Sequence, residues 1–191
     1  MRLQFNNRLT HALLVLSAAC LLASLPALAQ PPAQAQKLAP YVTSPQPIVE
    51  KMLEVARLKN GETLFDLGCG DGRILFSAAR NFGARAHGVE LSPTLAKRAQ
   101  QMVDSQGLQD QVTITQGDMM KVDVSSANVV SLYLMTEANE QLRPKLEREL
   151  KPGARVVSLE FKIKGWKPSR VEKVEAHRHP YTIYLYELPQ K

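Results

Sequence analysis

The stretch that decides the fold is TLFDLGCGDG, residues 63–72. Its first half is an apolar segment of strand length, and its second half places Gly68, Gly70 and Gly72 directly before a helix-forming segment, residues 73–80. Glycine lets the backbone turn sharply and lets a ligand come close, and the following helix directs the positive end of its dipole toward the loop. Because an acid-x-Gly-x-Gly-x-Gly string occurs by chance in under about 1% of chains of this length, the stretch predicts a ligand site at a strand-to-helix junction.

Segments of strand and helix character alternate on both sides of this loop. The predicted helices cover residues 44–60, 73–80, 93–105 and 136–150, the last of them kinked or split by Pro144. The predicted strands cover residues 63–67, 84–91, 112–115, 128–134 and 154–161, followed by 171–174 and 182–188. Such alternation implies parallel strands joined by right-handed crossovers, whereas the last two strands, with no helix-length segment between them, pair as an antiparallel hairpin. We therefore expect an α/β fold with a mostly parallel seven-stranded sheet and helices on both faces.

The N-terminal residues have the pattern of a targeting segment. Arg2 and Arg8 precede an uncharged apolar run at residues 12–25, and small residues stand at the −3 and −1 positions of a cleavage point after residue 29. A membrane-spanning helix needs about 20 residues, which the run approaches when its flank is included. Residues 1–29 are thus either a cleaved signal peptide or an uncleaved anchor. In both cases the domain is expected outside the cytoplasm: exported, periplasmic or anchored to the membrane.

Length and composition predict one domain after this segment. Residues 30–40, rich in Pro, Ala and Gln, are expected to be a linker, and residues 41–191 the domain. Of the 191 residues, 45% are hydrophobic and 22% charged, as in ordinary globular proteins. The net charge of +6 is too mild to demand nucleic acid, and no nucleic-acid partner is expected. Cys20, Cys69 and four histidines show no metal-ligand spacing, so no metal site is expected either.

Acidic residues lie at the ends of three successive predicted strands. Asp66 precedes the first glycine of the loop, Glu90 lies 18 residues beyond Gly72, and Asp118 follows the third strand. A dinucleotide-binding loop reads Gly-x-Gly-x-x-Gly, and here the last spacing is one residue short. A carboxylate before the first glycine would repel a pyrophosphate but suit a cation, and one at the position of Glu90 can accept hydrogen bonds from ribose hydroxyls. The pattern disfavours a dinucleotide oxidoreductase and favours a cationic ligand with a ribose.

This loop resembles motif I of the class I S-adenosylmethionine (SAM) methyltransferases. Further segments resemble the mitochondrial protein-lysine methyltransferases that act on adenine nucleotide translocase and on the ATP synthase c subunit. The resembling segments are Pro40-Tyr41-Val42, residues 66–74, 88–91, 128–130, 145–150 and 154–157, and Trp166. The resemblance implies a Rossmann-like class I methyltransferase fold, SAM as the cofactor, and a lysine side chain of a protein as the substrate. It implies these cofactor-binding residues: Tyr41, Asp66, Gly68, Gly70, Gly72, Glu90 and Asp118.

The same resemblance points to the segment after the fourth strand as the one that faces the substrate. There we predict Tyr133, Glu137 and Asn139 as catalytic residues. A lysine amine must be neutral before it can accept a methyl group, and with an ordinary pKa of about 10.4 its deprotonation at pH 7 costs roughly 4–5 kcal/mol. The substrate site must therefore desolvate the amine or hold an acceptor for its proton.

Two other functions remain open at this point. A compact chain without a large substrate domain also suits a methyltransferase that acts on a small molecule. A non-catalytic exported protein on the SAM-binding fold is the other alternative, because SAM is made in the cytoplasm and an exported enzyme needs it outside. In all three cases the N-terminal segment predicts membrane association if it is not cleaved.

Overall fold

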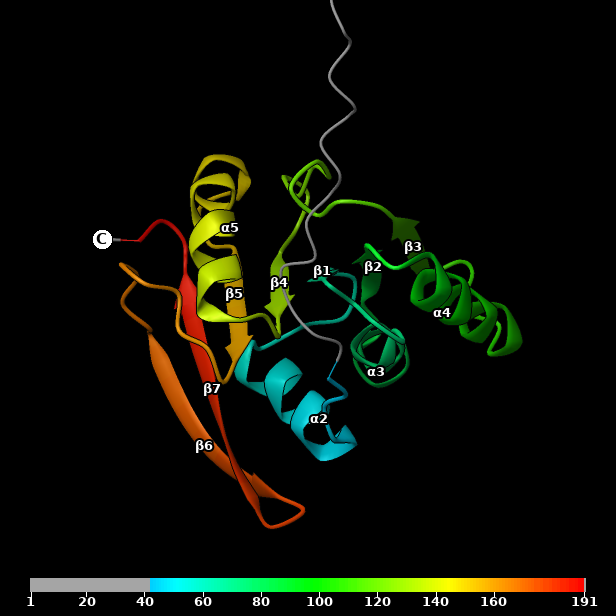
Figure 1. Ribbon diagram of the computed structural model, residues 1–191, viewed down its shortest axis with the longest axis horizontal. Helices are drawn as coiled ribbons and strands as arrows, with labels where there is room; N and C mark the ends of the chain where they lie inside the picture. The colour runs from blue at the N-terminus through cyan, green and yellow to red at the C-terminus, as the bar shows by residue number, and fades with distance from the viewer. Residues whose placement is uncertain (1–41, 191) are drawn as a thin grey trace, which may run out of the picture. The chain divides into compact units, whose positions relative to one another are not determined.

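The computed structural model describes residues 42–190, and the expected leader (1–29), the linker (30–40) and Tyr41 lie outside this range. A seven-stranded sheet runs through the domain in the order β3-β2-β1-β4-β5-β7-β6 (Figure 1). The strands are β1 (Thr63–Leu67), β2 (Arg85–Glu90), β3 (Val112–Gln116), β4 (Val129–Leu132), β5 (Arg155–Leu159), β6 (Arg170–Ala176) and β7 (His179–Glu187). β1 to β5 are parallel to one another, and β7 is antiparallel to both β5 and β6. The predicted sheet and C-terminal hairpin are confirmed.

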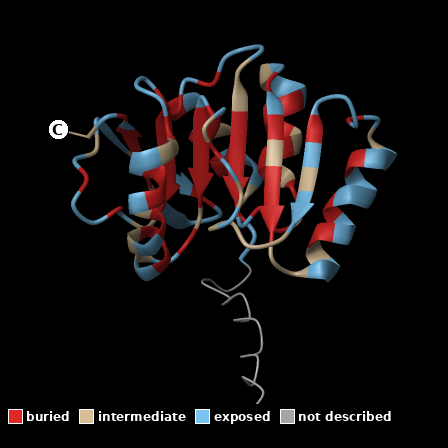
Figure 2. Ribbon diagram, turned by 90° about the horizontal axis from the view of Figure 1, so that it is seen from above, coloured by how far each residue is buried: buried red, intermediate tan, exposed pale blue. Residues whose placement is uncertain are grey.

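Helices cover both faces of this sheet. The described helices are α2 (Gln46–Val55), α3 (Arg73–Phe82), α4 (Pro93–Ser105) and α5 (Thr136–Glu149). Apolar residues of α2, α3 and α4 belong to one core cluster, and those of α5 belong to a second cluster on the other face. Figure 2 shows buried central strands with the exposed side of the helices turned outward. β4 and β5 are buried along their whole length, as expected for strands of a sheet that is covered by helices on both faces.

Most element boundaries lie where the sequence predicts them. α4 begins at Pro93, with the Ser92 hydroxyl accepting a hydrogen bond from the backbone N–H of Leu95 at 3.4 Å. α5 continues through Pro144 as a single helix, so this proline does not split it. In the part of the chain from residue 42 to 190, no helix is both long and apolar enough to cross a membrane.

The hairpin is longer than predicted. The predicted strands leave residues 175–181 between them, whereas in the structure only His177 and Arg178 connect β6 to β7. Both have positive φ angles, 53° and 62°. Two-residue turns of this kind favour Asn and Gly, and the turn is invisible in the sequence because neither residue is present.

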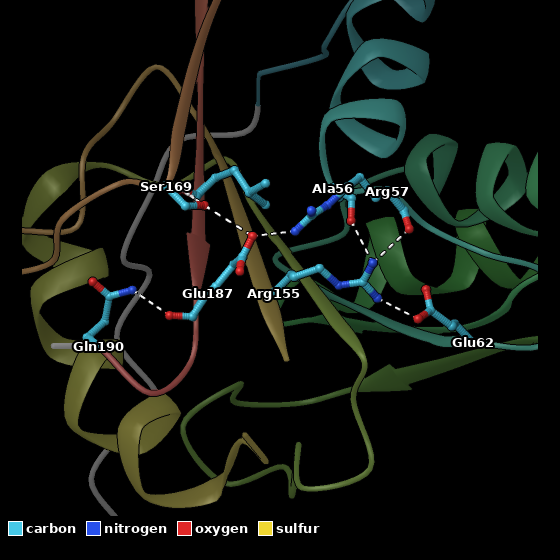
Figure 3. A network of polar contacts seen from close by, with 8 residues as sticks. Ala56, Arg57, Glu62, Arg155, Ser169, Glu187 and Gln190 are labelled. Carbon is cyan, nitrogen blue, oxygen red and sulfur yellow. Dashed lines mark hydrogen bonds and ion pairs between the residues drawn. The ribbon is translucent and has the colours of Figure 1, made fainter. Parts of the chain in front are cut away.

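Arg155 ties α2 to the sheet at the end opposite to the glycine loop. Its Nη1 donates to the carbonyl oxygens of Ala56 (2.9 Å) and Arg57 (2.7 Å), and its Nη2 donates to Oε1 of Glu62 at 2.6 Å (Figure 3). The residue is buried at the start of β5, with 7% of its surface exposed. A cation at the C-terminal end of a helix also interacts favourably with the helix dipole. The contact fixes the position of α2. Residues 42–44, which precede this helix, reach the cavity described below.

Candidate active site

A cavity of about 360 Å³ lies at the carboxyl ends of β1, β2, β3 and β4. Its walls come from the glycine loop after β1, from residues 89–92 after β2, and from residues 117–119 after β3. Residues 42–44 and 133–134 complete it. In open α/β sheets ligands bind in this place, outside the carboxyl ends of the strands.

The backbone of the glycine loop forms one wall of the cavity. Gly68, Gly70 and Gly72 all have positive φ angles, of 86°, 56° and 84°, a region that residues with a side chain rarely adopt. A Cβ atom on Gly72 would also lie 2.7 Å from Cζ of Phe76. Gly72 itself does not line the cavity and instead precedes α3 as its N-cap residue. The third glycine therefore serves the turn into the helix, and the first two form the ligand-facing backbone.

Glu90 holds the glycine loop against the end of β2. One carboxylate oxygen accepts a hydrogen bond from the N–H of Gly70 at 2.9 Å, and the other accepts one from the N–H of Ser92 at 2.8 Å. The side chain is buried, with 9% of its surface exposed, and it lines the cavity. A carboxylate has about four acceptor positions, so two remain for the hydroxyls of a ligand.

Asp66 is the most deeply buried carboxylate of the cavity. The Ser131 hydroxyl of the neighbouring strand β4 donates to its Oδ1 at 2.7 Å. Burial raises the pKa of Asp66 from its usual 3.8 to about 7; the Ser131 hydrogen bond opposes this shift, and the charges of Glu90 and Asp71 add to it. A cation in the cavity would stabilise the ionised form. Ionised Asp66 is therefore unfavourable in the empty cavity, and a positively charged ligand offsets this cost.

Asp118 and the pair Asp71–Arg73 complete the polar lining. Oδ1 of Asp118 accepts a hydrogen bond from the N–H of Met120 at 2.9 Å, which fixes the side chain after β3. Arg73 donates from Nε and Nη2 to the two carboxylate oxygens of Asp71 (2.9 and 2.6 Å) and from Nη1 to the carbonyl of Ser44 (2.6 Å). Arg73 therefore joins the loop to the segment that covers it.

The lining fits a cationic nucleoside and opposes a phosphate. Four acidic side chains and one basic side chain line the cavity, and the basic one, Arg73, is engaged by Asp71. Apolar contributions such as Ile74, Leu95 and Met119 offer a surface for a flat base. Among residues 42–190, no group of three or more His, Cys, Asp or Glu side chains is arranged to hold a metal ion.

The three predicted catalytic residues lie in different surroundings. Tyr133 lines the cavity at the end of β4, and burial raises the pKa of its hydroxyl. Glu137 is exposed in the first turn of α5 and does not line the cavity. Asn139 is fully buried, and its Nδ2 donates to the carbonyl oxygens of Leu134 (3.4 Å) and Phe161 (3.2 Å), which joins the segments after β4 and β5. The catalytic roles of these three residues stay predictions.

The structure places five of the predicted cofactor residues around the cavity, and their binding roles likewise stay predictions. These five are Asp66, Gly68, Gly70, Glu90 and Asp118. Tyr41 lies outside the described residues.

Sequence reasoning missed Ser131 and the Asp71–Arg73 pair. Ser131 contacts Asp66 of another strand, and Arg73 contacts Ser44 of the segment before α2. A single polar residue inside the apolar strand Val129–Leu132 was the available signal for Ser131.

The strand order and the acidic cavity behind a glycine loop define a class I SAM-dependent methyltransferase, with S-adenosylmethionine as its cofactor. The family model for the ANTKMT methyltransferase domain matches residues 66–170, and the chain belongs to this family. A protein-lysine N-methyltransferase of Saccharolobus islandicus is 45% identical over 148 residues, which cover 77% of this chain and 92% of the relative. The adenine nucleotide translocase lysine N-methyltransferase of Mus musculus is 38% identical, with 69% of this chain and 57% of the relative covered. This chain thus spans less than two thirds of the length of the mouse relative.

A solved structure of the same fold is also similar in sequence. The crystal structure of an RNA methyltransferase from Salinibacter ruber, in complex with S-adenosyl-L-homocysteine, has a TM-score of 0.74 and 41% identity to this chain. The match covers 78% of this chain and 95% of that one. A protein with the same fold and a similar sequence thus binds S-adenosyl-L-homocysteine, which is SAM without its methyl group.

Proposed function

We propose that this methyltransferase transfers the methyl group of SAM to the ε-amine of lysine residues in a protein substrate. The observation that carries the proposal is the similarity to the Saccharolobus islandicus protein-lysine N-methyltransferase, which is 45% identical and covered over 92% of its length. Tyr133 at the end of β4 lines the cavity, where its hydroxyl or ring face would orient an amine.

The residues of this chain have separate tasks in such a reaction. SAM supplies an electrophilic methyl group on a sulfonium. Asp66, Glu90 and Asp118 present carboxylates to a ligand that carries positive charge and hydroxyls. Binding both reactants in one orientation is worth about 7–11 kcal/mol of the barrier in well-aligned systems. The protein thus contributes positioning and a charged enclosure, and the substrate contributes the nucleophile.

RNA methylation is the second candidate, and it rests on the Salinibacter ruber protein, which is described as an RNA methyltransferase and is 41% identical to this chain. The acidic cavity argues against an RNA substrate entering deeply, because a phosphate backbone would meet four acidic side chains and a single arginine. Methylation of a small molecule is the third.

A transfer assay with the full chain separates these candidates. The purified protein is incubated with SAM labelled in its methyl group and with cell protein, cell RNA or a small-molecule extract. We expect label in protein, recovered as methyllysine after acid hydrolysis. Asp66→Ala and Glu90→Ala should abolish the transfer, whereas Asp110→Ala, a change at an exposed carboxylate outside the cavity, should leave it intact.

The outcomes of this assay are distinct. Label that stays in RNA, or in small molecules alone, would refute the protein-lysine assignment. A folded protein that binds SAM but transfers nothing to any of the three substrate classes would favour the non-catalytic alternative.

We also propose that the domain is exported and acts outside the cytoplasm, on the pattern of residues 1–29. Alkaline phosphatase fused after residue 40 is active only outside the cytoplasm, so activity of the fusion supports export. An inactive, stable fusion would place the domain in the cytoplasm, where SAM is made. The size of the mature chain by mass spectrometry then distinguishes a cleaved signal from an anchor.

A further inference from the structure

Three aromatic side chains and a carboxylate form a cluster beside the cavity. Tyr133 follows β4, Glu160 and Phe161 follow β5, and Tyr181 belongs to β7. The ring centroids of Tyr133 and Phe161 are 6.3 Å apart, at an interplanar angle of 33°. Glu160 and Tyr181 are near enough to Tyr133 for their charges to add to the upward shift of its pKa. Because Tyr133 also lines the cavity, it is the residue that the cluster and the cavity share.

The long hairpin brings Tyr181 to this place. β7 pairs with β5 only as far as Ile183, opposite Leu159 at the end of β5, and its first four residues pair with β6 alone. At about 3.3 Å per residue, four residues correspond to roughly 13 Å of strand. Figure 1 shows the hairpin extending past the end of β5. The overhang carries Tyr181 past the carboxyl end of β5, at the edge of the sheet where the cavity lies.

Glu160 has an unusual backbone conformation at the point where β5 ends. Its φ angle is 64°, in the left-handed region that residues with a side chain rarely adopt. Its N–H donates to the carbonyl of Thr182 at 2.7 Å, and Oε1 of its half-buried carboxylate accepts a hydrogen bond from the N–H of Thr182. Among the described residues, no lysine or arginine forms an ion pair with Glu160. Backbone outliers of this kind concentrate at functional sites.

Lys162, the lysine closest to Glu160 in the sequence, is directed elsewhere. Nζ of Lys162 lies 5.6 Å from the ring centroid of Tyr184. Tyr184 packs against the α5 side of the sheet, whereas Tyr133 and Tyr181 pack against the α2 side. The cluster therefore combines a carboxylate with aromatic rings and receives no cation from its own neighbour Lys162.

We propose that Tyr133, Glu160, Phe161 and Tyr181 form the slot that receives the ammonium end of the substrate lysine, with Glu160 as the residue that selects a cation. This inference rests on the proposed lysine substrate. Ring faces attract an alkylammonium, and a carboxylate forms charge-assisted hydrogen bonds with it. Glu160 captures and orients the amine; since a carboxylate favours the charged form of its partner, deprotonation is not its task.

A binding experiment tests the slot without knowledge of the protein substrate. n-Butylammonium reproduces the lysine side chain, and its binding to the full chain saturated with S-adenosylhomocysteine is followed by NMR. We expect saturable binding to the wild type and none of neutral n-butanol. Glu160→Gln keeps an acceptor for the N–H of Thr182 but removes the charge, and should weaken binding roughly tenfold to a hundredfold. Glu160→Gly suits the φ angle of 64° and guards against a folding defect.

Kinetics with lysine peptides provide the second readout. Glu160→Gln should raise the KM for the peptide at least tenfold, change kcat less, and leave the affinity for S-adenosylhomocysteine unchanged. Glu175→Gln, a matched change at an exposed position of β6, should behave as wild type.

Each result either supports or overturns the assignment. Unchanged n-butylammonium binding and an unchanged peptide KM in both Glu160 variants would overturn the slot, as would the absence of any n-butylammonium binding to the wild type. If no lysine peptide is methylated while n-butylammonium binds in a Glu160-dependent way, the proposed function fails and the slot stands as an alkylammonium site.

Discussion

Replacing Asp66 with asparagine should make the unliganded protein more stable at neutral and alkaline pH. The carboxyl group is 3% exposed and titrates at about 7 in the folded protein, against 3.8 when unfolded. Between these two pH values the folded state binds more protons than the unfolded state, so the free energy of unfolding falls as pH rises. At about 1.4 kcal/mol per pH unit, the wild type should lose about 4 kcal/mol between pH 4 and pH 8 because of this one group.

Asp66→Asn removes this loss while keeping the shape of the side chain and an acceptor for the Ser131 hydroxyl, which donates at 2.7 Å. Urea unfolding at pH 5 and pH 8, each without ligand, measures the effect. The variant should be more stable than wild type at pH 8 by about 4 kcal/mol and by clearly less at pH 5. Asp110→Asn, at an exposed site, should stay within about 0.5 kcal/mol at both.

The reasoning would be refuted if wild type and Asp66→Asn showed the same dependence of stability on pH. That result would mean that the buried carboxyl ionises as it does in the unfolded chain, and that the cavity holds no unfavourable charge for a cation to relieve. If Asp66→Asn gains stability but still binds SAM as well as wild type, the result supports the cost of burying the carboxylate. The same result refutes a role of this carboxylate in SAM binding.

Three further results are expected. SAM should bind the wild type about tenfold more weakly at pH 6 than at pH 8, because only about a tenth of Asp66 is ionised at pH 6; calorimetry measures this, and a flat profile would contradict it. Arg155→Ala should lower the free energy of unfolding by about 3 kcal/mol, since it leaves Glu62 and helix carbonyls unpaired, yet SAM should bind the folded variant normally; a lost affinity would show that the anchor shapes the cavity. Gly88→Ala should cost about 1–3 kcal/mol in urea unfolding, because its Cβ would lie 2.4 Å from Cδ1 of Leu75; a neutral variant would mean that this packing yields easily.

Local chemistry made most elements predictable. The start of α4 follows from Ser92 and Pro93, which suit the N-cap and the first position of a helix. β1 agrees with its predicted range because an apolar run meets the glycine loop directly. The predicted hairpin is too short, because the turn at His177 and Arg178 has left-handed backbone angles that are not typical of these residue types.

Some residues of the candidate site could likewise be predicted from the sequence, and others required the tertiary structure. Asp66, Glu90 and Asp118 could be selected from the sequence, since each lies at the end of a predicted strand and parallel strands end at one edge of a sheet. Ser131 could not be assigned as the partner of Asp66, because that contact requires β4 to lie beside β1 in a particular register. The exposure of Glu137 and the burial of Asn139 likewise depend on how α5 is rotated against the sheet.

The sequence by itself thus determined the order of the elements, the glycine loop, the cationic character of its ligand and the family, because these depend on residues close together in the chain. Only the tertiary structure decided that Glu160 and Tyr181 lie near Tyr133, and that Asp66 is buried against Ser131. These pairs of residues are between 27 and 65 positions apart in the sequence. They arise from strand order, register and the overhang of a hairpin, which no local pattern encodes.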